Sequence, residues 1–318
     1  MALTDGWNSN QWLHMGLRTG DSRTFAYFEE LKEAFRKQLS YLVKMCAVAI
    51  NINELVLADV YPTVYQSALI EDCIEKGISR EEGGARFNFG PCIATCGAVD
   101  VANSLAAIKR LVFEEKSISM ARLLDSLADN FQKDDLLRQK ILAVPKFGNN
   151  DDYVDDLAVW VMKTFCEEVV SHKNTRGGHL MPYQNPLGSY VPFGSLTPAL
   201  PSGRKAGEPL SDGISPTIGS DVNGPTAVIR SVGKIDSIRL GHGQSLNMRL
   251  DGSVFREKDG IGRFVALIRT YLDQKIHHIQ FNLVSNEILR AAQEKPDDYR
   301  DLIVRVAGYC AYFVQLRK

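Results

Sequence analysis

The stretch RVAGYCAYF, residues 305–313, lies close to the end of a chain of 318 residues. It offers no acid, base or metal site of the usual kind, and its unusual feature is Gly308, in a segment of mostly bulky residues. Glycine loses more conformational freedom on folding than any other residue, so helices and strands disfavour it in their interiors. Gly308 therefore calls for a structural or chemical explanation.

Upstream of this stretch, hydrophobic periodicity predicts a series of helices. Over residues 25–46, apolar side chains recur every three or four residues, with charged side chains on the opposite face. The same pattern predicts helices over residues 101–113 and 119–131, and another that begins near Asp151. Residues 176–226 are rich in glycine and proline, which predicts a long loop. Loops of this length are usually functional or disordered, and the apolar and aromatic residues within this one favour an ordered, functional loop.

The C-terminal part of the sequence returns to alternating helices and strands. It predicts a helix around residues 261–273, a buried strand in HHIQFNLV (277–284) and a helix from Ser285. Helices that alternate with short apolar strands are typical of a parallel α/β architecture. We therefore expect an α/β fold.

Composition excludes several classes of protein. With 37 basic and 38 acidic residues, the chain lacks the basic surplus of proteins that bind nucleic acids or membrane surfaces. Hydrophobic residues make up 45% of the sequence, which is ordinary for a globular protein with a buried core, and 318 residues suffice for one large α/β domain or two smaller ones. No apolar run approaches the ~20 residues that span a bilayer. The six cysteines show no disulfide spacing, which predicts a reducing cytoplasm.

Two residue pairs that could carry chemistry have simpler structural interpretations. Cys92 and Cys96 form a C-x3-C pair instead of the C-x2-C of zinc and redox sites, and no second cysteine pair accompanies them. Burial as small residues is the favoured interpretation, and no metal site is predicted. His277 and His278 lead into the predicted strand, where adjacent side chains point to opposite faces. At most one of them can enter a given site, and packing is the favoured role.

Two loops could shape a binding site. GGARFNFG (83–90) is rich in glycine, but it lacks the Lys followed by Ser or Thr that marks a phosphate-binding loop. A tight turn beneath a pocket is therefore predicted. PSGRKAGEPLSDGISP (201–216) is dense in turn formers. Its chemistry fits a structured surface loop as well as a binding loop, and this choice stays open.

Several segments taken together resemble the C-terminal part of the glycyl radical enzymes, the family that includes pyruvate formate-lyase. They follow the order of the family along nearly the whole chain. The segments are TGDSRTF (19–25), NSLAAIKRLVFEEKSIS (103–119), PKFGNNDDYVDDLA (145–158), SGRKAGEPLSDGISP (202–216), GPTAVIRSV (224–232), HIQFNLVS (278–285) and DLIVRVAGYCAYF (301–313). The last is similar to the signature of the family around its radical glycine.

The resemblance implies a chemical role for Gly308. Removal of a hydrogen atom from its α-carbon leaves a radical delocalised over both flanking amides, which needs a flat backbone that glycine tolerates. In the family a partner activase installs this radical with an iron–sulfur cluster and S-adenosylmethionine, so no bound cofactor is expected in this chain. The glycyl radical then takes a hydrogen atom from a cysteine thiol, and the thiyl radical attacks the substrate.

The catalytic cysteine of the family lies in a loop that precedes the counterpart of TGDSRTF. The first residues of this chain resemble the helix after that loop, and none of the six cysteines matches the loop itself. We therefore expect the cysteine loop and the preceding half of the enzyme upstream, and no turnover from this chain alone. The alternative is a non-catalytic fragment or a radical-domain subunit.

The fold of the family is a ten-stranded α/β barrel made of two half-barrels, inside which the cysteine and glycine loops meet. The resemblance implies that this chain holds the second half-barrel and the glycyl radical loop. We expect residues 1–195 to belong to a pyruvate formate-lyase-like domain and residues 196–318 to be the glycyl radical domain. The expected partners are the activase, the upstream half, a small-molecule substrate and, in the complete enzyme, a second copy in a homodimer.

The substrate pocket is expected at two apolar segments. One carries Tyr190, Val191 and Phe193, and the other is the strand SLNMRL with Leu246 and Met248. This lining favours an apolar substrate, as in the aryl- and alkylsuccinate synthases or the aryl-acetate decarboxylases. A small-substrate enzyme, such as a formate acyltransferase or a diol dehydratase, is the alternative. Structural packing would explain the same residues.

Overall fold

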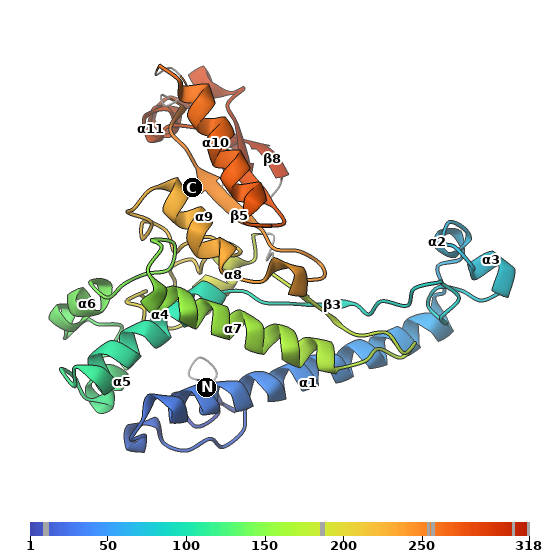
Figure 1. Cartoon of the computed structure of the whole chain (residues 1–318), viewed down its shortest axis with the longest axis horizontal. Helices are drawn as coiled ribbons and strands as arrows, with labels where there is room; N and C mark the ends of the chain where they lie inside the picture. Colours follow the sequence, from blue (N-terminus) through green and yellow to red (C-terminus); the bar gives the residue numbers. More distant parts are fainter. Residues whose placement is uncertain (9–12, 185–187, 253–254, 256–257, 307–308, 317–318) are drawn as a thin grey trace.

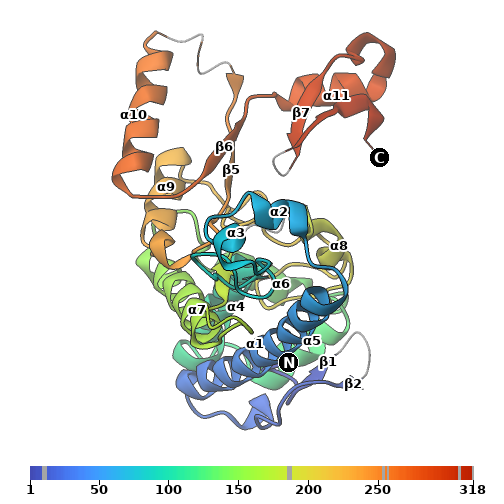
Figure 2. The ribbon, with the colours of Figure 1, turned by 90° about the vertical axis from the view of Figure 1, so that its right-hand side faces the viewer.

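The structure, a computed structural model, has a helical N-terminal part in which the long helix α1 (Phe28–Val60) lies along α7 (Asp152–Ser171) (Figure 1). The helices α2 (Val64–Ala68) and α3 (Cys73–Lys76) lie at the far end of α1. The C-terminal helices and strands stand above this helical part (Figure 2). The structure describes residues 1–8, 13–184, 188–252, 255, 258–306 and 309–316.

The longest helix, α1 (Phe28–Val60), begins where the Glu30 carboxylate accepts hydrogen bonds from two backbone N–H groups just before the helix, at 2.6 and 2.9 Å. The sequence predicts this helix over residues 25–46, and the prediction of a helix is confirmed. The helix is longer than predicted because no glycine or proline interrupts the chain before Pro62.

By length and composition, α1 is the one helix among the described residues that could cross a membrane. Core helices of soluble proteins can have the same length and apolar composition. Within α1, the buried Glu54 forms an ion pair with Arg176 at 2.9 Å, and both side chains are shielded from solvent. This ion pair ties the apolar half of α1 to the loop that follows α7.

Four helices form the core beside α1. Among them, α4 is buried on almost every side and packs along α7. Side chains of Ser119, Asp134 and Asp151 cap the other three by accepting hydrogen bonds from backbone N–H groups. The helix predicted to begin near Asp151 is confirmed. The bounds are α4 (Ala98–Ile108, continued by the π-helical segment Lys109–Glu114), α5 (Met120–Ala128), α6 (Asp135–Leu142) and α7 (Asp152–Ser171).

Four strands run parallel in the order of the chain. β3 pairs with β4, and β5 pairs with β6. A parallel bridge between Gln184 and Gln244 joins the two pairs. Helices α4 to α7 connect β3 to β4, α9 precedes β5, and α10 connects β5 to β6, which confirms a mixed α/β structure. The bounds are β3 (Cys92–Ala94), β4 (Met181–Tyr183), α9 (Pro225–Gly233), β5 (Leu246–Arg249), α10 (Gly260–Asp273) and β6 (Ile279–Asn282).

The remaining elements are short. β1 pairs with β2 and β7 with β8, both antiparallel. They comprise β1 (Trp7–Asn8), β2 (Leu13–His14), α2 (Val64–Ala68), α3 (Cys73–Lys76), α8 (Tyr190–Ser195), α11 (Asn286–Glu294), β7 (Ile303–Val306), β8 (Tyr309–Tyr312) and the 3-10 turns Ser22–Thr24, Ser237–Arg239, Pro296–Tyr299 and Phe313–Gln315.

Two sequence predictions need correction. The strand in HHIQFNLV is half-buried instead of buried, because among the described residues β6 pairs with β5 on one side only. The loop over residues 176–226 contains β4 and α8. It is nevertheless held firmly, since the Arg204 guanidinium donates hydrogen bonds to five backbone carbonyls within it.

A buried carboxylate joins α7 to α9. Asp155 is fully buried, and its Oδ2 accepts hydrogen bonds from Ser231 Oγ (2.9 Å) and Lys234 Nζ (2.7 Å). Lys234 also contacts Asp152 at 2.6 Å, but that carboxylate is 83% exposed. The same lysine therefore has one buried and one exposed acidic partner on the same helix.

We predict that Asp155→Ala lowers the free energy of unfolding by about 3 kcal/mol or more, because it leaves buried donors without their acceptor. The matched control Asp152→Ala removes the exposed partner and should cost less than about 1 kcal/mol. Urea unfolding followed by circular dichroism measures both. Equal losses in the two variants would show that the buried contact does not join these helices.

Candidate functional site

Gly308 lies outside the described residues. The strands on either side of it in the sequence are described: β7 ends at Val306, β8 begins at Tyr309, and these two residues are paired in the antiparallel register. The predicted role of Gly308 stays a prediction.

A cavity of about 500 Å³ lies at the carboxyl ends of β5 and β6, and we call it the strand-end cavity. Ligands of α/β proteins commonly bind at this end of parallel strands. Its lining combines β5, β6, α8, the start of α9 and the loop that precedes α9. The lining residues are Tyr190, Asp212, Ser215, Pro216, Ile218, Gly219, Asp221, Gly224, Pro225, Val228, Asn247, Met248, Arg249 and Asn282.

The alternation of side chains along β5 decides which residues reach this cavity. Successive strand residues point to opposite faces. Leu246 is fully buried in the hydrophobic core and does not line the cavity, whereas Asn247 and Arg249 do. Met248 is 5% exposed, belongs to the core and also contributes to the cavity wall. The strand therefore presents mainly polar groups to the cavity.

Asp212 and Asn247 form the polar centre of the strand-end cavity. Asn247 Nδ2 donates to Asp212 Oδ2 at 2.7 Å, and the Asn247 backbone N–H donates to Ser215 Oγ at 2.9 Å. Burial raises the pKa of the Asp212 carboxyl, against the opposing effects of the Asn247 hydrogen bond and the Arg249 charge. Burial, followed by the charge of Asp212, also raises the pKa of Tyr190. These groups can hold hydroxyl or charged groups of a ligand.

The structure brings two of the five predicted pocket residues together: Tyr190 and Met248 both line the strand-end cavity. Val191 and Phe193 lie on α8 with 48% and 52% of their surfaces exposed, and they do not line this cavity. Leu246 lies in the core.

The polar residues of this cavity that sequence reasoning missed include Asp212, Asn247 and Arg249. For the two on the strand a signal was present, because polar and apolar residues alternate in SLNMRL. Asp212 had no such signal, since it lies in the turn-rich loop 201–216.

Cys96 is half-buried and near enough to Asp212 for that carboxylate to affect the pKa of its thiol, whereas Cys92 is exposed, so the prediction of burial is wrong for Cys92. Burial, followed by the carboxylates of Asp100 and Asp212, raises the pKa of the Cys96 thiol to about 11. The thiol form therefore dominates at neutral pH. No cluster of three or more histidine, cysteine, aspartate or glutamate side chains suited to a metal ion occurs in the part of the chain that the structure describes.

Comparisons with known proteins identify the family of this chain. The sequence model described as pyruvate formate lyase-like matches residues 1–194, and the one described as glycine radical matches residues 210–314. Trans-4-hydroxy-L-proline dehydratase of Clostridioides difficile is 38% identical over 100% of this chain and 40% of its own length. (2S)-3-sulfopropanediol dehydratase of Klebsiella oxytoca is 35% identical over 100% of this chain and 39% of its own length.

A solved structure of similar fold is the glycerol-bound, B12-independent glycerol dehydratase from Clostridium butyricum. It superposes with a TM-score of 0.94 at 38% identity, over 99% of this chain and 40% of that protein. The chain thus spans about 40% of the length of the relatives it matches. Both family models match in sequence order, and dehydratases are similar to the chain over its whole length. This chain therefore belongs to the glycyl radical enzymes.

Proposed function

We propose that this chain carries the radical-storing part of a glycyl radical enzyme that removes water from a small hydroxylated substrate, with the radical on Gly308. The observation that carries the choice of substrate is the polar lining of the strand-end cavity, centred on Asp212 and Asn247. The dehydratases among its relatives, which are named for trans-4-hydroxy-L-proline, sulfopropanediol and glycerol, support the same class of reaction.

The radical step follows from the chemistry of the α-carbon. An activase removes one hydrogen atom from Gly308, and the unpaired electron spreads over the adjacent amides. In this family the activase is generally a radical enzyme that uses S-adenosylmethionine, and we propose an iron–sulfur activase of that kind here. Because dioxygen adds to carbon radicals, the proposed setting is a reducing, anaerobic cytoplasm.

A cysteine thiol carries the hydrogen-atom transfer. The Gly308 radical takes the hydrogen from sulfur and becomes glycine again, and the thiyl radical takes a hydrogen from a substrate carbon. After the C–O bond breaks and water leaves, the product radical recovers the hydrogen from the thiol, and the thiyl radical that results takes a hydrogen from Gly308, which restores the stored radical. We propose that this thiol lies in the part of the enzyme that the chain does not span, since none of the six cysteines matches the cysteine loop. This chain would then be inactive by itself.

The rest of the proposal concerns assembly. The parallel order β3, β4, β5, β6 supports the second half of an α/β barrel, which the upstream half would complete. We retain the division into residues 1–195 and 196–318 and the homodimer of the complete enzyme as parts of this proposal.

An apolar substrate, as predicted from Tyr190, Val191 and Phe193, has little support. A cavity of about 500 Å³ suits a small ligand, and a hydrocarbon would bring no hydrogen-bonding group to its strand residues Asn247 and Arg249. The Asp212 carboxylate, which accepts one hydrogen bond from Asn247, would gain no further donor from an apolar ligand. A hydroxylated substrate satisfies these groups.

For Gly308, we predict that Gly308→Ala abolishes the radical in the complete, anaerobically activated enzyme. The wild type should show an electron paramagnetic resonance doublet split by the remaining α-hydrogen, and oxygen should then cleave the backbone at Gly308. A matched control is Gly177→Ala, at an open position with φ of 84° where a side chain costs strain but meets no atom. A doublet that survives Gly308→Ala would remove the radical from this residue.

For the substrate, we predict that Asp212→Asn lowers kcat/KM at least about tenfold for a hydroxylated substrate, since hydrogen bonds to charged groups contribute about 1.5–3 kcal/mol. Phe193→Ala should change it less than about twofold, because the ring is half exposed outside the cavity. Steady-state kinetics with glycerol, 1,2-propanediol and trans-4-hydroxy-L-proline measure both. The reverse ranking, with turnover of an aryl acetate, would establish the apolar alternative.

A further inference from the structure

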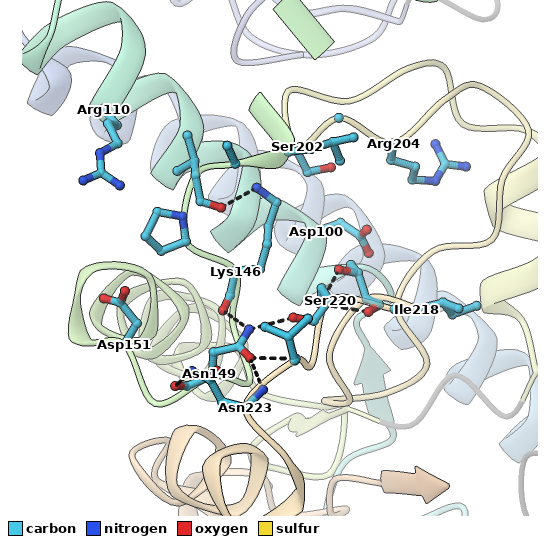
Figure 3. Close-up of a pocket in the computed structure, with 18 of the residues that line it drawn as sticks. Asp100, Arg110, Lys146, Asn149, Asp151, Ser202, Arg204, Ile218, Ser220 and Asn223 are labelled. Carbon is cyan, nitrogen blue, oxygen red and sulfur yellow. Dashed lines mark hydrogen bonds between the residues drawn. The ribbon is translucent and has the colours of Figure 1, made fainter. Parts of the chain in front are cut away.

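A second and larger cavity, of about 1180 Å³, lies at the end of α6 and the start of α7 (Figure 3). We call it the α6-end cavity. Loops around residues 202–209 and 217–223 complete its wall. Of its lining residues, only Ile218 and Gly219 also line the strand-end cavity, where we propose that the substrate binds.

Two cations of this cavity are held only by backbone carbonyls. Lys146 Nζ donates to the carbonyls of Ile141 (2.7 Å) and Val144 (2.8 Å) and has no acidic partner among the described residues. Arg138 Nε donates to the carbonyl of Gly203 at 2.9 Å. Among the residues that the structure describes, no carboxylate lies within ion-pair distance of either cation. Both charges are therefore anchored in position and available to an anion.

Both cations are held at or beside α6. Lys146 is bound to carbonyls at the end of α6, and Arg138 belongs to the same helix. The turn that contains Ser202 and Gly203 rests on that helix end, because a side-chain carbon added to Gly203 would lie 2.8 Å from Leu142. Ser202 is therefore the third polar group at this point of the cavity.

Buried polar atoms without partners mark the same region. Ser202 is 5% exposed and Asp100 1% exposed, yet Ser202 Oγ and Asp100 Oδ1 have no hydrogen-bond partner. Buried polar atoms are almost always paired, by protein, ligand or water. Burial raises the pKa of Asp100, which favours the neutral carboxyl that can donate a hydrogen bond. Figure 3 shows Asp100, Ser202 and Lys146 around the same cavity.

Apart from Asp100, the acidic residues of the cavity are engaged elsewhere. Asp151 Oδ1 accepts from a backbone N–H at the start of α7 (2.9 Å), and Asp152 pairs with Lys234. Glu208 accepts from the backbone N–H of Lys205 at 3.0 Å. In Figure 3, Asp151 lies on the side of the cavity opposite Ser202 and Arg204.

The surroundings of the Lys146 amine favour an anion beside it. Burial lowers the pKa of Lys146 to about 8, and no nearby acid offsets this effect. An anion bound beside the amine would stabilise its charged form.

We propose that the α6-end cavity is a second ligand site, which binds a phosphate monoester through Arg138, Lys146 and Ser202. A guanidinium, an ammonium and a hydroxyl together supply the donors that phosphate oxygens accept. The cavity is far larger than a phosphate ion, so the remaining volume takes the organic part of the ligand. Because Ile218 and Gly219 line both cavities, the ligand would lie against a wall that the strand-end cavity shares.

The test measures binding by isothermal titration calorimetry with ribose 5-phosphate, inorganic phosphate and ribose. It uses the complete protein carrying Gly308→Ala, so that the result does not depend on radical chemistry. We expect ribose 5-phosphate to bind with Kd below about 1 mM, more tightly than inorganic phosphate, and ribose not to bind. Failure of both phosphates to bind, which would leave water as the occupant, overturns the proposal.

Matched variants locate the site. Lys146→Gln and Ser202→Ala should each weaken ribose 5-phosphate binding, by about tenfold for the lysine. Lys140→Gln, an equal loss of charge at an exposed position of α6, and Ser237→Ala, at a buried serine with an equally unpaired hydroxyl outside the cavity, should leave it unchanged. Ser202→Ala should keep the wild-type melting temperature, because its hydroxyl has no partner to lose. Equal weakening by Lys140→Gln would assign the binding to general surface charge and overturn the site.

Discussion

The parallel pairing of β3, β4, β5 and β6 is the constraint from which the rest of the arrangement follows. Parallel neighbours cannot be joined by a tight turn, so each connection must cross back over the sheet. The connections here are the helices α4 to α7, α9 and α10, and they bury one face of the strands. The other face is left with polar side chains, among them Asn247 and Arg249. A polar cavity at the strand ends is thus a consequence of how the core is covered.

The loop before α9 depends on a close backbone approach. Ile214 N–H donates to the Ser245 carbonyl at 3.0 Å, and Gly213 adopts a φ of 60° beside it. A side-chain carbon on Gly213 would lie 2.3 Å from that carbonyl oxygen, so glycine is required there. Gln184 adds a hydrogen bond from Nε2 to the Gly213 carbonyl at 2.7 Å. Together these contacts fix the adjacent Asp212 at the cavity, so its position is determined by backbone geometry.

The sequence predicts those elements that depend on residues close to one another along the chain. Helical period and the capping Asp151 predict α7, and the alternation of helices with short strands predicts a mixed α/β chain. The extension of α1 to Val60 is less visible, because its last turns show little apolar periodicity and expose many apolar side chains. The orientation of β5 needs tertiary information: SLNMRL alternates clearly, but only the helices packed on Leu246 decide which face lines the cavity. The family is apparent in the order of several segments along the chain, and no single segment is enough to identify it.

The wall between the two cavities is held by hydrogen bonds more than by packing. Asn149 Oδ1 accepts from the backbone N–H groups of Val222 and Asn223 (2.9 and 3.0 Å), and its Nδ2 donates to the Ser220 carbonyl at 2.7 Å. Gly219 has a φ of 79° with no atom near a potential side chain, and Ile218 is 71% exposed. A segment with few apolar contacts opens at low free-energy cost compared with the core. One asparagine side chain therefore sets the position of a wall that both cavities share, and a ligand that shifts it on one side must alter the volume on the other.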